Sequence, residues 1–110
     1  MRRFTIAITI AAGAAFACLT VPAAAAEHVI SQKDGAFSVS NLNVKPGDEV
    51  AFRNDDKVFH NVFSLSKLLP FDLGAYGPGQ SKKVKVEQAG KILVECAIHP
   101  NMSMVIDVSK

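Results

Sequence analysis

Hydrophobic and polar residues alternate along the chain in short stretches that turn residues separate. In residues 83–87, Val84 and Val86 alternate with charged side chains, and a period of two is typical of a β-strand with one buried face. Pro46 and Gly47 lie between two such stretches and suit a tight turn. After residue 27, no stretch has the period of an amphipathic helix. The pattern predicts strands near residues 28–30, 36–40, 41–44, 49–53, 58–62, 83–87, 91–96 and 104–108.

This series of short strands predicts an all-β fold, a Greek-key antiparallel β-sandwich of about seven to eight strands. A chain of this length buries only ~60 to 65% of its unfolded surface, so we expect a single core. Residues 64–80 contain apolar side chains without a clean period, interrupted by Pro70 and Gly74, and predict a structured loop. In residues 58–62, His60 shares a face with two valines, so its imidazole is expected to point toward the interior of the sandwich or its rim.

The beginning of the chain has the pattern of a secretory signal peptide. A short basic start precedes an apolar stretch from Phe4 to Leu19, and an alanine-rich A-x-A pattern ends at Ala26. We expect residues 1–26 to be removed, leaving a single domain at 27–110 that is exported to the periplasm. No later apolar run is long enough to span a membrane. Lipidation at Cys18 is an alternative, although the residues before it fit a lipoprotein site poorly.

Charge and cysteine content narrow the classes of function. The 12 basic residues outnumber the 10 acidic ones only because of Arg2 and Arg3, so the domain is close to neutral and a nucleic-acid partner is not expected. If Cys18 leaves with the signal peptide, Cys96 is the one cysteine left in an oxidising compartment. A metal thiolate, an intermolecular disulfide and an inert buried thiol are the three explanations, and the residues that follow Cys96 favour the first.

The segment after residues 91–96 concentrates metal-binding side chains. Cys96, His99 and Met102 supply a thiol, an imidazole and a thioether within seven residues, and His60 can supply a second imidazole from another strand. Soft sulfur together with imidazole suits copper, because sulfur binds Cu(I) and imidazole binds both oxidation states. Zinc is a weaker alternative, since it gains little from a thioether. The sequence therefore predicts one copper-binding site in the domain at 27–110, with His60, Cys96, His99 and a methionine thioether of this segment as ligands.

These motifs resemble those of the cupredoxins, the small blue copper proteins, and within them the amicyanin, plastocyanin and pseudoazurin group. The resemblance rests on the turn and strand from Val44 to Val50, on His60-Asn61-Val62 and on the pattern C-x-x-H-P-x-M from Cys96 to Met102. It implies a type 1 copper ion bound by His60, Cys96 and His99, with a long axial sulfur. It also implies that Asn61 braces the ligand loop and that a nearby backbone amide donates to the Cys96 sulfur.

Two methionines compete for the axial position. Met102 follows His99 by three residues, as in the short amicyanin loop with a proline after the histidine, whereas Met104 has the longer spacing of plastocyanin. Met104 also falls on the inward face of the last predicted strand, where a core side chain is expected. We therefore favour Met102.

The donor set and the resemblance imply a monomeric carrier of single electrons between periplasmic redox partners, such as a c-type cytochrome or a dehydrogenase. His99 would lie in a small apolar docking patch with Ala97, Ile98 and Pro100, and Leu68 or Phe71 are further candidates for it. A copper-trafficking protein without an electron-carrier role is the alternative, and a metal-free interaction module is another. The sequence has no Ser-His-Asp order, phosphate-binding glycine loop or carboxylate pair, so we do not expect an enzyme.

Overall fold

The computed structural model describes residues 13 and 24–110. The predicted signal peptide therefore lies largely outside the described residues, and so does Cys18, the alternative lipidation site. No helix in the described part of the chain is long and apolar enough to cross a membrane. The nine strands are β1 (Glu27–Lys33), β2 (Ala36–Phe37), β3 (Asn41–Val44), β4 (Glu49–Asn54), β5 (His60–Ser64), β6 (Phe71–Tyr76), β7 (Ser81–Lys85), β8 (Gly90–Glu95) and β9 (Ser103–Val108).

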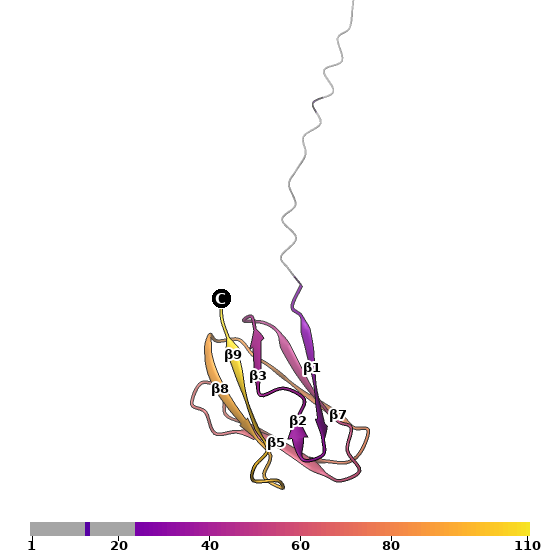
Figure 1. The fold of residues 1–110 in the computed structure, drawn as a ribbon. Coiled ribbons are helices and arrows are strands. Elements are labelled where there is room, and N and C mark those ends of the chain that lie inside the picture. The colour runs from indigo at the N-terminus through magenta and orange to yellow at the C-terminus, as the bar shows by residue number, and fades with distance from the viewer. Residues whose placement is uncertain (1–12, 14–23) are drawn as a thin grey trace, which may run out of the picture.

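The strands form two packed sheets (Figure 1), which confirms the predicted all-β sandwich. One sheet has the order β2-β1-β4-β7 and the other β3-β9-β8-β5-β6, so the chain crosses repeatedly between them. Two pairings, β1 with β4 and β3 with β9, are parallel, where the sequence analysis expected antiparallel neighbours throughout. Parallel neighbours need a crossover connection. Here β2 and β3 separate β1 from β4 along the chain, so that β4 returns beside β1 in the same direction.

The core fills the space between the sheets. Phe52 in β4 is fully buried and meets Phe37 edge to face, with ring centroids 6.0 Å apart. Burial of an aliphatic or aromatic side chain of this size stabilises a fold by roughly 1.5 to 3 kcal/mol. In β8 and β9 every second residue is buried, as the alternation predicted. The inward residues of these two strands are Ile92, Val94, Met104, Ile106 and Val108.

Strand β6 forms where the sequence analysis expected a loop, and β5 begins later than predicted. The register between β5 and β6 shifts between Asn61 and Phe63, because Asn61 pairs with Ala75 whereas Phe63 pairs with Asp72. This bulge disturbs the alternation of buried and exposed side chains along β6, which is why the strand has no clean period in the sequence. Val58 precedes β5 and is 47% exposed, so it does not share the buried face of His60.

Three connections meet at one end of the sandwich, at the bottom of Figure 1. They are the β8–β9 connection, the β1–β2 turn and the segment that leads into β5. The β1–β2 turn is tight, with Asp34 at φ +53° and Gly35 at φ +68°, a left-handed conformation that glycine adopts without strain. Residues that are distant in sequence are therefore brought together at this end.

Candidate metal centre

Strands β5 and β8 carry the first two candidate ligands, His60 and Cys96, to the same end of the sandwich. His60 is the first residue of β5, and Cys96 follows directly after the last residue of β8. The connection that follows is closed by two backbone hydrogen bonds: the Met102 amide donates to the His99 carbonyl (2.9 Å), and the Cys96 amide donates to the Met102 carbonyl (3.1 Å). The tight loop turns His99 back toward the thiol, so local sequence spacing brings these two side chains together.

His60, Cys96 and His99 converge. The Cys96 Sγ atom lies 3.8 Å from His60 Nδ1 and 3.8 Å from His99 Nδ1, and the three donor atoms lie within 4.8 Å of one another. The two imidazole rings are tilted by 39° with centroids 4.7 Å apart. His60 and Cys96 are 0% and 3% exposed, whereas His99 is partly exposed. The structure thus joins three of the four predicted ligands in a cluster whose outer member reaches the surface.

The donor atoms fit a single metal ion. Sulfur and nitrogen ligands lie roughly 2.0 to 2.3 Å from a first-row metal, so in a trigonal arrangement they are about 3.8 Å apart. Both sulfur-to-nitrogen distances have this value. One thiolate and two imidazoles in a trigonal arrangement are the donor set that copper uses in electron-transfer sites.

Met102 and Met104 are both buried, at 1% and 2% exposure, and the strand register distinguishes them. Glu95 lies opposite Ser103 in the β8–β9 ladder, and the bond from the Cys96 amide to the Met102 carbonyl extends the ladder by one residue. Met102 is therefore opposite Cys96, and residues directly opposite one another have Cβ atoms about 5 Å apart on the same face. Met104 lies opposite Val94, deeper in the core. The register favours Met102 as the sulfur nearest the cluster.

Asn61 connects the cluster to the sheet around it. Its backbone amide donates to Cys96 Sγ (3.4 Å), and its side-chain oxygen accepts the Ala97 amide (3.4 Å). The side-chain nitrogen donates to Asp72 Oδ1 in β6 (2.9 Å). The Asp72 pKa is lowered, first by the Gly74 amide and then by this Asn61 bond. Both features that the resemblance implied, the Asn61 side chain bracing the loop and a nearby backbone amide donating to the sulfur, are confirmed, and the amide is that of Asn61 itself.

Tyr76 borders the cluster on its inner side. It lies opposite His60 in the β5–β6 ladder and is 2% exposed. Its hydroxyl donates to the Gln32 side-chain oxygen in the other sheet. Burial, and then the proximity of Cys96, raise the pKa of Tyr76, so it is neutral in any ordinary buffer. The cluster therefore has an uncharged side chain, Tyr76, opposite His60.

His60 has a carboxylate partner, Asp56, that the sequence analysis did not identify. Asp56 Oδ2 lies 3.0 Å from His60 Nε2, the ring nitrogen that does not face Cys96. The bond to His60, followed by the bond from the Lys57 amide, lowers the pKa of Asp56 to about 2. The sequence does place Asp56 four residues before His60. The two side chains can meet only if the chain turns between them, and the sequence pattern does not indicate that turn.

The surface around His99 is partly apolar, but two of its predicted members lie elsewhere. Ile98 is 48% exposed beside His99, and Phe59, next to His60, is 59% exposed. Leu68 instead packs against Gly90 at the far end of β8 from Cys96, and Phe71 pairs with Ser64 at the far end of β5 from His60. The expectation that Leu68 or Phe71 joins the patch was wrong, because β5 runs away from His60 and the segment between β5 and β6 lies at its far end.

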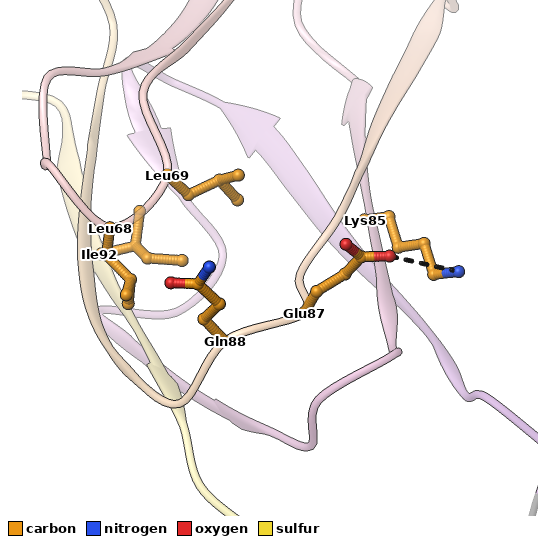
Figure 2. Close-up of a pocket in the computed structure, with 6 residues that line it drawn as sticks. All are labelled: Leu68, Leu69, Lys85, Glu87, Gln88 and Ile92. Carbon is orange, nitrogen blue, oxygen red and sulfur yellow. Dashed lines mark ion pairs between the residues drawn. The ribbon is translucent and has the colours of Figure 1, made fainter.

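The cavity in Figure 2 is also remote from the cluster. It has a volume of about 80 Å³ and contains none of the predicted ligands. Its lining residues are Leu68, Leu69, Lys85, Glu87, Gln88 and Ile92. A space of this size holds a few water molecules, so it offers no room for an organic substrate.

Comparison with known proteins agrees with this geometry. The profile of the copper-binding proteins of the plastocyanin/azurin family matches residues 24–109. The methylamine utilization protein MauL of Methylorubrum extorquens is 27% identical over 103 residues, which cover 93% of this chain and 90% of that protein. The chloroplastic plastocyanin of Fritillaria agrestis is 30% identical over 112 residues, covering 90% of this chain and 68% of that protein. Among solved structures, an oxidised amicyanin variant is similar with a TM-score of 0.71 at 22% identity, covering 74% of this chain and 81% of that one.

Proposed function

The chain belongs to the plastocyanin/azurin family of copper-binding proteins, with copper as its cofactor, and on this basis we propose that it carries single electrons between periplasmic redox partners. The convergence of one thiol and two imidazole Nδ1 atoms carries the proposal. In it, His60, Cys96 and His99 bind the ion and Met102 supplies a weak axial sulfur. When bound, the copper accepts one electron as Cu(II) and donates it again as Cu(I).

The protein scaffold supports this role by keeping the ligands in place. Cu(II) and Cu(I) favour different geometries, so ligands that cannot rearrange reduce the structural change that accompanies each transfer. His60 and Cys96 are buried in the sandwich, and Cys96 is held by the Asn61 amide. His99 is the partly exposed ligand, and we propose that electrons enter and leave through its imidazole.

We place this exchange in the periplasm. The proposal rests on the basic and apolar start of the sequence and on its A-x-A pattern, which together indicate that residues 1–26 direct export and are removed. The partners would then be exported redox proteins, such as a c-type cytochrome or a dehydrogenase.

The proposed site is tested by the visible and electron paramagnetic resonance spectra of the protein loaded with Cu(II). We expect an intense blue or green absorption band from thiolate-to-copper charge transfer, together with a type 1 signal, since the thiol lies among the ligands. A colourless protein that binds only Cu(I) would contradict the electron-carrier proposal and favour copper trafficking. A protein that binds no copper would contradict both.

Substitution of Ile98 by lysine is expected to slow electron transfer to the partner without changing the copper spectrum. Ile98 is exposed beside His99, and a charge there would have to be desolvated in an apolar contact. We expect a loss of about tenfold in the second-order rate, equivalent to ~1.4 kcal/mol. Stopped-flow mixing of the reduced protein with a candidate cytochrome measures this rate.

Val29→Lys is the matched control, because Val29 is 50% exposed, much like Ile98, but lies on β1 outside the β8–β9 connection. An equal effect of the two substitutions would show that net charge, and not the surface around His99, controls the encounter. An unchanged rate for both would place the docking surface elsewhere.

A further inference from the structure

The buried ligand His60 has both of its ring nitrogens engaged. Nδ1 faces the Cys96 sulfur, whereas Nε2 faces the Asp56 carboxylate at 3.0 Å. The His60 side chain is 0% exposed and that of Asp56 is 14% exposed. An imidazole that binds a metal through Nδ1 keeps its proton on Nε2, so His60 can donate this proton to Asp56. The contact is therefore a charge-assisted hydrogen bond inside the protein.

We propose that Asp56 is a positioning residue that fixes the His60 ring through Nε2 and lowers the reduction potential of the centre by favouring Cu(II). This inference rests on the proposed function, because it assumes that His60 is a copper ligand. Asp56 lies outside both ligand motifs, His60-Asn61-Val62 and the segment from Cys96 to Met102.

The carboxylate is itself held in place by backbone hydrogen bonds. The Lys57 amide donates to Asp56 Oδ1 (2.8 Å), and the Gly35 amide donates to Oδ2 (3.4 Å). The Asp56 amide donates to the side-chain oxygen of Asn54 (2.9 Å), a residue that is 0% exposed. Asp56 therefore does not need to reorganise in order to orient His60.

The Asp56 carboxylate binds both His60 and the β1–β2 turn. Gly35 belongs to the β1–β2 turn, and a Cβ atom placed on it would lie 4.0 Å from His99 Cδ2. The turn whose amide binds Asp56 thus also lies beside the outer ligand. Asp56 therefore connects the buried ligand His60 to the turn that lies beside the partly exposed ligand His99.

The electrostatic effect follows from the charge of the two oxidation states. Both carboxylate oxygens of Asp56 accept backbone N–H donors, from Lys57 and from Gly35, and such donors stabilise the negatively charged form. A negative charge against a ligand of the metal stabilises the more positive state, and partial burial limits the screening by water. The bond to Nε2 also makes the imidazole a better electron donor, which acts in the same direction. Removing this charge should raise the reduction potential.

The test compares Asp56→Asn with Asp55→Asn in the copper-loaded protein. Both substitutions remove one negative charge, but Asp55 is exposed and binds Arg53 Nε (2.8 Å), with no bond to His60. We expect Asp56→Asn to lower the ratio of Cu(II) to Cu(I) affinity about tenfold, which raises the potential by about 59 mV for a one-electron couple. Asp55→Asn should leave the ratio close to that of the unchanged protein. Equal potentials for the two variants would overturn the inference.

Chelator competition measures the two affinities directly, so a variant that loses copper on dialysis still gives the ratio. A second measurement needs no variant: in the Cu(I) protein, NMR should detect a slowly exchanging proton on His60 Nε2. Rapid exchange of this proton would also overturn the inference. If the unchanged protein lacks a type 1 spectrum, the proposed function fails instead, so the two failures are distinguishable.

Discussion

Replacing Cys96 by serine is expected to abolish the visible absorption band and to weaken copper binding by more than about 100-fold. The thiol is the single sulfur within the cluster of three donor atoms, and a hydroxyl is a poor ligand for Cu(I). Even the partners that orient metal ligands cost roughly 10- to 100-fold when they are removed, so loss of a ligand should exceed that. Absorption spectra and copper competition with a chelator measure both effects.

The fold should survive this change. Cys96 is 3% exposed, and a serine hydroxyl is small enough to occupy its place and accept the Asn61 amide. We expect the metal-free variant to lose only ~1 to 2 kcal/mol in free energy of unfolding, as is usual for a buried substitution of similar size. Far-ultraviolet circular dichroism and thermal unfolding of the metal-free proteins provide this control. A serine variant that kept the visible band would exclude Cys96 as the source of the colour.

Replacing Met102 by leucine is expected to raise the reduction potential by about 60 to 120 mV, whereas Met104→Leu should leave it unchanged. Met102 lies opposite Cys96 across the β8–β9 ladder, and Met104 lies opposite Val94 in the core. Cu(I) is stable with three ligands, whereas Cu(II) favours a fourth, so loss of the axial donor destabilises Cu(II) more than Cu(I) even though the thioether is soft. Each tenfold change in their relative affinity corresponds to about 59 mV. Protein-film voltammetry of the two variants measures the difference.

The two methionine variants control for one another, because both residues are buried and both substitutions conserve volume. Exchange of methionine for leucine in a core usually costs less than ~1.5 kcal/mol, so both variants should fold. If Met104→Leu shifts the potential and Met102→Leu does not, the axial sulfur is that of Met104, and the preference derived from the loop spacing is wrong.

Local patterns made the sandwich and most of the cluster predictable. The alternation of Ile92 and Val94 continues to Cys96, which placed the thiol at the inner edge of the sheet, and the short spacing to His99 brought the imidazole to it. His60 was predicted from the face that it was expected to share with Val58. The structure buries His60 but exposes Val58, because β5 begins only at His60. The prediction that His60 points inward is therefore right, but the shared face with Val58 from which it was argued does not exist.

Long-range relations were not predictable. The contact between Asp56 and His60 depends on the path of the chain between Asn54 and β5, which Asn54 holds by accepting the Asp56 amide and donating to the Val58 carbonyl. Nothing in the sequence period encodes that path. Strand β6 was missed for a similar reason, since its register with β5 contains a bulge and its pairing depends on a distant strand.

The parallel pairing of β3 with β9 affects when the protein can acquire copper. Asn41 pairs with Val105 and Val44 with Val108, so this edge of the sheet forms only once the last strand has been synthesised. Pairings between such distant residues slow folding, and sandwiches of this kind typically fold in milliseconds to seconds. His60 and Cys96 come from strands of the same sheet and meet only when it closes. The copper site can therefore be complete only after these strands have paired, and a chain that has not yet folded would carry an unprotected thiol.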